Sequence, residues 1–268
     1  MKVKTYEYLK KYVETPSPSG YEVALGGQKV WTDIVKDFCP GAKVDLDNYG
    51  NALAKYNGFD EDKPTLLLDA HVDEIAFIVR DITSEGFLKV DRLGGSDITI
   101  TPSSRVTIYT FDKKKVRGVF GHPAIHVQPF NYKIDPNNMF IDTGKGSKDN
   151  VIKSGIEIGN PVVMDGNLER LGDYVCSKAL DDKVGGLITA LVLKKLHKKS
   201  IKLDFNLVVV NSVQEEVGLR GADIVSKTLT LKEGSSAIAI DVSHCTDSPA
   251  YNKSKHGSTS SGKGPIVF

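Results

Sequence analysis

The sequence has few cysteines, no long apolar run and no excess charge of either sign. Its three cysteines, Cys39, Cys176 and Cys245, lie far apart and form no Cys-x-x-Cys pair, which disfavours a disulfide framework or that type of structural zinc site. The start, residues 1–7, lacks the apolar core of a secretory signal. The 35 basic and 34 acidic residues nearly cancel, which argues against nucleic-acid or membrane partners. We therefore predict a cytoplasmic protein with free thiols and a local binding site.

The 268 residues suffice for a large core and show two kinds of pattern. Helical spacing covers 4–14, 23–38, 182–198 and 222–228, and strand-like runs cover 43–46, 52–56, 65–70, 205–213 and 237–240. Between them, 74–165 contains short β-like pieces broken by Gly, Pro and Asp, such as 105–110, 115–120 and 161–164. We expect an α/β fold in which helices flank a mixed sheet, formed by 1–73 and 166–268, with a small β-barrel-like domain inserted at 74–165.

Four segments place metal-binding side chains at the edge of an apolar run. They are His71-Val72-Asp73-Glu74, Asp181-Asp182, Glu215-Glu216 and Asp241. Because an α/β sheet presents its functional groups where strands end, these residues can converge although they lie far apart in sequence. Together they predict one hydrolytic site that holds two metal ions.

Each segment alone also has a plain structural interpretation. His71 can be a strand-end histidine near surface acids, although the two-residue spacing lets Asp73 orient its ring; Glu74 can be simply solvated. Asp181 and Asp182 can cap the helix that follows. Adjacent Glu215 and Glu216 can be a surface capping pair, but their repulsion at the mouth of a buried strand is what a cation would relieve. Only the combination favours the metal site.

The combination resembles the dinuclear metallo-aminopeptidases that include the glutamyl, deblocking and tetrahedral aminopeptidases. The matching stretches are 69–77, 178–185, 213–222 and 241–244, in the order of the family. Among them, Gln-Glu-Glu-Val-Gly-Leu-Arg-Gly at 214–221 is highly specific. The resemblance covers nearly the whole chain.

The resemblance implies a role for each residue. His71 and Asp241 would each bind one metal, Asp181 would bridge the pair, Glu216 would complete one ligand set, and Glu215 would be the general base with Asp73 orienting His71. In the family a further ligand histidine follows the Gly-Pro that corresponds to 264–265, so the catalytic domain is expected without its carboxyl-terminal part. His244 and His256, the nearest downstream histidines, do not match that position, and truncation and replacement both stay open.

The expected function is removal of the amino-terminal residue of peptides by a water that two divalent ions activate, zinc or else cobalt or manganese. The inserted domain is expected to help build a homo-oligomer, as it does in the family. The alternatives are a catalytically impaired or noncatalytic member that acts in assembly, and a hydrolase of a non-peptide amide or a glycan on the same scaffold.

Overall fold

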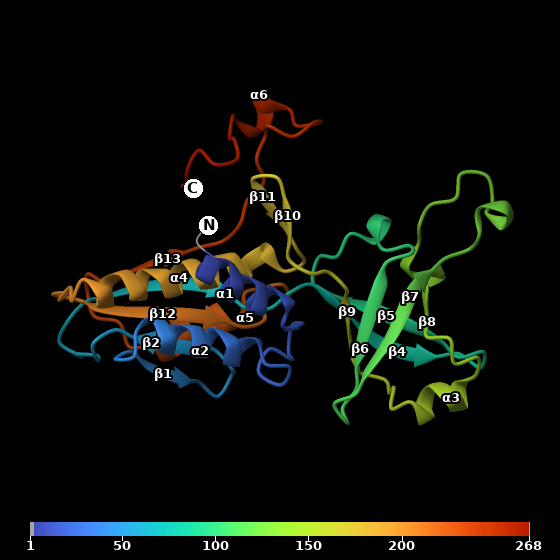
Figure 1. The fold of residues 1–268 in the computed structure, drawn as a ribbon, viewed down its shortest axis with the longest axis horizontal. Helices are drawn as coiled ribbons and strands as arrows, with labels where there is room; N and C mark the ends of the chain where they lie inside the picture. Colours follow the sequence, from blue (N-terminus) through green and yellow to red (C-terminus); the bar gives the residue numbers. More distant parts are fainter. Residues whose placement is uncertain (1–2, 268) are drawn as a thin grey trace.

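A mixed sheet and a six-stranded barrel lie side by side in the computed structural model, which describes residues 3–267 (Figure 1). The helices are α1 Val3–Glu14, α2 Gly27–Phe38, α3 Lys148–Lys153, α4 Leu180–Lys198, α5 Arg220–Thr228 and α6 Lys253–His256, and the 3-10 turns are η1 Ile98–Ile100, η2 Ile125–Val127 and η3 Pro136–Asn138. The strands are β1 Lys43–Leu46, β2 Ala52–Lys55, β3 Thr65–His71, β4 Ala76–Ile82, β5 Phe87–Leu93, β6 Arg105–Tyr109, β7 Lys115–Gly121, β8 Phe140–Asp142, β9 Pro161–Met164, β10 Glu169–Leu171, β11 Tyr174–Cys176, β12 Asn206–Ser212 and β13 Ser236–Ala239. The helix-flanked mixed sheet and the closed barrel confirm the expected fold class.

The sheet has the strand order β1-β2-β12-β3-β13. β12 and β13 both run parallel to β3, whereas β2 runs antiparallel to β12 and β1 antiparallel to β2. The carboxyl ends of β3, β12 and β13 therefore open on one edge, where ligand sites form in such sheets.

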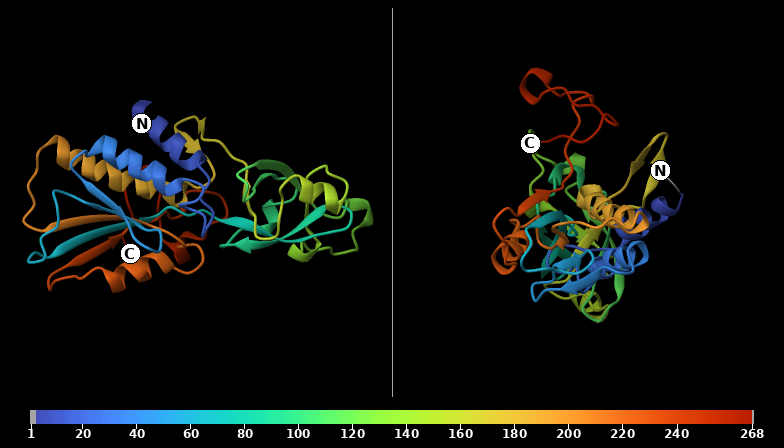
Figure 2. Two further views of the ribbon diagram at one scale, coloured as in Figure 1. Left: turned by 90° about the horizontal axis from the view of Figure 1, so that it is seen from below. Right: turned by 90° about the vertical axis from the view of Figure 1, so that its left-hand side faces the viewer.

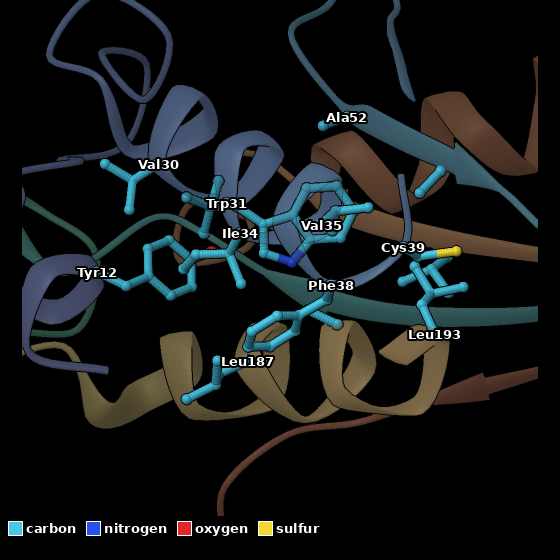
Figure 3. Packing of buried hydrophobic residues seen from close by; sticks show 14 of the residues in the cluster. Tyr12, Val30, Trp31, Ile34, Val35, Phe38, Cys39, Ala52, Leu187 and Leu193 are labelled. Carbon is cyan, nitrogen blue, oxygen red and sulfur yellow. The ribbon is translucent and has the colours of Figure 1, made fainter. Parts of the chain in front are cut away.

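Helices cover both faces of this sheet (Figure 2). Alternate residues of β12 point to opposite faces: Leu207 and Val209 join the core beneath α1, α2 and α4, and Val208 and Val210 pack with Val225 of α5. The larger core packs around Trp31, which is fully buried (Figure 3). Its Nε1 donates a hydrogen bond to the Gly186 carbonyl at 2.9 Å. This packing fixes α4, and with it the loop that carries Asp181.

The barrel closes in the order β4-β5-β8-β7-β6-β9 and has its own core. Phe77 and Phe120 meet edge-on within it at 4.8 Å between ring centroids. Its strands lie within the expected insert, 74–165, although the exact division into domains stays a prediction. No helix within 3–267 is long and apolar enough to cross a membrane.

Two helix boundaries differ from the sequence expectation. The helix expected over 23–38 begins only at Gly27, because Gly26 takes a left-handed conformation with φ 99° that ends the preceding turns. In α4, Asp181 and Asp182 have non-helical backbone angles, so regular helix begins after them. The second departure falls on Asp181, one of the predicted site residues.

Candidate metal centre

The three parallel strands deliver the predicted residues to one edge of the sheet. His71 ends β3 and pairs in register with Ser212 at the end of β12, while Glu215 follows three residues after β12 and Asp241 two after β13. Asp181 enters from the start of α4. The His71 Nε2 atom lies 3.0 Å from Asp181 Oδ1, 3.7 Å from Glu215 Oε2 and 4.0 Å from Asp241 Oδ1.

Two sets of donor atoms lie close enough to hold a cation. His71, Asp181 and Asp241 form one, and His71, Glu215 and Glu216 form the other, with the ligand atoms of each set within 4.8 Å of one another. The sets share His71, whereas the sequence expectation had Asp181 as the shared, bridging ligand. The structure thus brings all five residues together, and their separate roles stay predictions.

Asp73 connects the histidine to the turn that carries the two glutamates. His71 Nδ1 lies 3.1 Å from the Asp73 backbone oxygen and 3.4 Å from its carboxylate. The same carboxylate accepts the backbone N–H groups of Glu215 at 2.9 Å and Glu216 at 3.2 Å, and the Ser19 hydroxyl at 2.6 Å. Burial alone would raise the pKa of Asp73, but the His71 ring and the Ser19 hydroxyl outweigh it and hold the pKa below its ordinary value. Asp73 therefore stays ionised and fixes both sides of the site.

Glu22 supports the same turn, and no sequence pattern marked it. Its carboxylate accepts the backbone N–H of Gln214 at 3.0 Å, and only 3% of the residue is exposed. Burial raises the pKa of Glu22 to about 7. In the sequence Glu22 only precedes an expected helix, so its burial follows from tertiary packing alone.

Glu74 is not solvated, in contrast to the simplest sequence interpretation. It is 3% exposed and lies 2.7 Å from Lys178 Nζ and 3.5 Å from Lys183 Nζ, and it accepts the Ser17 backbone N–H at 2.8 Å. Burial would raise the pKa of Glu74, but Lys183 and Lys178 lower it below its ordinary value. Because the two lysines flank Asp181 in sequence, this buried ion cluster anchors the loop that carries Asp181.

Asp182 caps the regular part of α4. The sequence had predicted a helix-capping role for Asp181 or Asp182 without deciding between them. Its Oδ1 accepts the backbone N–H of Gly185 at 3.2 Å, as an N-cap residue does. Its Oδ2 is buried without a hydrogen-bond partner among the described residues, and burial raises the pKa of Asp182 to about 8.

The donor set fits divalent cations. One imidazole and several carboxylates suit zinc, cobalt or manganese. Burial, and next the charge of Asp181, raise the pKa of Glu216 to about 7. A cation bound among these carboxylates would lower it again. The Asp181 and Asp241 side chains are 56% and 52% exposed, which leaves them open to an ion and a substrate.

The downstream histidines lie elsewhere. The His244 ring stacks on Tyr251 at 4.9 Å and lies 6.3 Å from the His256 ring, and within 3–267 neither histidine joins the two donor sets around His71. The three cysteines are free, as expected.

A helix-flanked mixed sheet with an acidic cluster at its strand ends and an inserted barrel is the architecture of the TET-type aminopeptidases. The chain belongs to the M42 glutamyl aminopeptidase family, whose model matches residues 50–268. The lysyl aminopeptidase of Pyrococcus furiosus is 29% identical over 267 residues, which are 98% of this chain and 72% of that protein. Across the curated relatives that it matches, the chain spans between 54% and 72% of their length.

Solved structures show the same fold. Aminopeptidase APDkam598 from the archaeon Desulfurococcus kamchatkensis matches with a TM-score of 0.83 and 31% identity, over 94% of this chain and 66% of that one. The TET1 peptidase of Pyrococcus horikoshii, which can assemble into a tetrahedron or a large octahedral shell, matches with a TM-score of 0.76 and 28% identity, over 88% of this chain and 68% of that one.

Proposed function

We propose that the protein is a metal-dependent aminopeptidase that removes the amino-terminal residue of peptides. The observation that carries the proposal is the convergence of His71, Asp181, Glu215, Glu216 and Asp241 on one sheet edge in a member of the M42 family.

In this proposal His71, Asp181, Glu216 and Asp241 hold two divalent cations, zinc or else cobalt or manganese. Bound there, the ions would polarise the scissile carbonyl and make water a stronger acid. Glu215 is the general base: it takes the proton of the attacking water and passes it to the leaving amine. Asp73 positions His71 and the Glu215 backbone.

Two substitutions separate metal binding from catalysis. We expect Glu215→Gln to lower kcat by about 10²- to 10⁴-fold on aminoacyl anilides while the metal content stays the same, because only the proton acceptor is lost. We expect Asp181→Asn to lower metal content and activity together. Elemental analysis measures the metal content and a rate assay measures the activity, with Glu85→Gln on an exposed barrel turn as the control.

Two bound ions without any hydrolysis of aminoacyl or short-peptide substrates would refute the proposal, and chelator-resistant glucan cleavage would favour a glycan hydrolase.

We further propose that the protein works as a homo-oligomer in the cytoplasm. Support comes from the assemblies named for the P. horikoshii TET1 structure. Light scattering after size-exclusion chromatography tests the assembly, and a monomer at micromolar concentration would refute it. Glutamyl and lysyl aminopeptidases both occur among the relatives, so membership does not fix the preferred amino-terminal residue.

A further inference from the structure

Two hollows flank the candidate metal centre. One, of about 180 Å³, borders His71 and Asp241 and has the small apolar side chains of Ala70, Ala222 and Ala239 in its wall. The other, of about 290 Å³, opens beside Asp181 and Glu216 between the sheet and the barrel. An aminopeptidase needs room for one side chain before the scissile bond and an open path for the peptide after it.

The second hollow adjoins a larger groove. It shares Met164 and Lys178 in its wall with a groove of about 580 Å³ that runs along the barrel. The alternate β6 residues Arg105, Thr107 and Tyr109 line the groove, so they present one face of that strand. Their neighbours on β7 extend this face, since Thr107 pairs with Arg117 and Tyr109 with Lys115. The groove thus adjoins the hollow beside the candidate metal centre and runs along the barrel.

Two cations in this groove have no ionic partner within the described part of the chain. Arg117 pairs with Asp165, which also accepts the Thr107 hydroxyl at 2.7 Å. Arg105 is exposed and unpaired within 3–267, and so is Lys115, whose Nζ lies 5.5 Å from the centre of the Tyr109 ring.

Acidic side chains also reach the groove, from its other wall. Glu14 at the end of α1 accepts the Leu168 backbone N–H at 3.1 Å, and Glu169 begins β10. The unpaired cations therefore lie on the barrel wall, where Asp165 is paired with Arg117, and Glu14 and Glu169 lie on the wall of the sheet domain. A peptide lying in the groove meets positive charge along β6 and β7.

We propose that this groove binds the leaving-peptide side of the substrate. Its terminal carboxylate is recognised by Arg105 in shorter peptides and, in longer ones, by Lys115, which pairs with Tyr109 four residues further along β6. The 180 Å³ hollow then receives the side chain of the amino-terminal residue. The inference rests on the proposed aminopeptidase function and adds the substrate class: short peptides with a free carboxyl end.

The test compares peptide acids with peptide amides. Peptides of two to six residues, with the first peptide bond reduced so that they resist cleavage, are titrated calorimetrically. We expect the best-fitting acid to bind about fivefold more tightly than its amide, the scale of one partly exposed ion pair. The double substitution Arg105→Gln and Lys115→Gln should abolish this difference. Lys153→Gln on α3, an exposed lysine that does not line the groove, should retain it.

Activity separates this inference from the proposed function. Aminoacyl anilides lack a leaving peptide, so their cleavage by the wild-type protein tests the aminopeptidase function independently of the groove. If anilides are cleaved but acids and amides of every length bind alike, the groove assignment is wrong. If acids bind better than amides and no substrate is cleaved, the groove assignment stands and the aminopeptidase function fails. Loss of the acid preference in Lys153→Gln would also overturn the assignment, since net charge alone would then explain it.

Discussion

At the residue scale, Glu22 makes stability depend on pH. Its pKa is raised from 4.5 to about 7 in the folded protein, so between these values the folded state binds a proton that the unfolded state has released. Protonated Glu22 contributes about 3 kcal/mol to the free energy of unfolding. This contribution is complete below pH 4.5 and is lost as the pH rises through 7. We expect Glu22→Gln to remove this loss, because the amide oxygen still accepts the Gln214 N–H without carrying charge.

Urea unfolding of the wild type and Glu22→Gln at pH 4.5 and pH 8 measures the effect. The variant should match the wild type at the lower pH and exceed it at the higher one. Glu233→Gln, an exposed acid far from the site in sequence, is the control. An equal gain from Glu22→Gln at both pH values would show that titration of Glu22 is not the cause.

Asp73 should control metal affinity without touching the metal. In Asp73→Asn an amide nitrogen replaces one of two oxygens that together accept two backbone N–H groups and the Ser19 hydroxyl. We expect the affinity for zinc to fall about 10- to 100-fold, the range for residues that orient ligands. Calorimetric zinc titration measures it beside Asp149→Asn, an exposed control on α3. Unchanged affinity would contradict the positioning role.

The sequence predicted the convergence of the metal-binding residues, but it did not predict the buried residues that hold them in place. His71, Glu215 and Asp241 follow apolar strands, and parallel strands share one edge, so their convergence could be expected from pattern alone. Glu22 and Glu74 could not be identified as buried, because an acid in a turn has the same local pattern whether the surrounding chain exposes or covers it.

At the scale of elements, the contact between α5 and β12 depends on Gly221. A Cβ atom there would lie 2.4 Å from both the Val213 carbonyl oxygen and Asn51 Oδ1. We expect Gly221→Ala to destabilise the protein by about 1–3 kcal/mol, because the backbone oxygen cannot move without displacing the end of β12. Gly41→Ala, where nothing lies within 4 Å, is the matched control in urea unfolding and should be nearly neutral. Equal midpoints for the two variants would contradict this account.

Element types were easier to predict than their partners. The mostly apolar stretch at 205–213 predicts a buried strand, and every residue of β12 is buried. The barrel strands are short and interrupted, so their sequence indicates β structure but not that β8 pairs with both β5 and β7. Such pairings join segments far apart in the chain, and packing of the whole barrel core decides them.

At the scale of the whole molecule, the sheet and barrel have separate cores that share no buried residue. Buried ion pairs between Glu74 and the lysines at 178 and 183 link the segment that leads into the barrel to the loop before α4. The metal centre draws every donor from outside the barrel strands. A bound ion should therefore stabilise the sheet domain more than the barrel.

Trp31 makes this difference measurable. It is the single tryptophan of the chain and is fully buried in the core of the sheet domain (Figure 3), so its fluorescence reports on that domain, whereas far-UV circular dichroism reports on both. We expect the two probes to give different unfolding midpoints in urea, because parts of a chain with separate cores can unfold separately. Zinc at 100 times its dissociation constant should raise the free energy of unfolding measured by Trp31 fluorescence by about 2.7 kcal/mol. The part of the dichroism change that does not follow Trp31, which reports on the barrel, should shift less. Coincident transitions that zinc moves together would instead show that the sheet and barrel unfold as one cooperative unit.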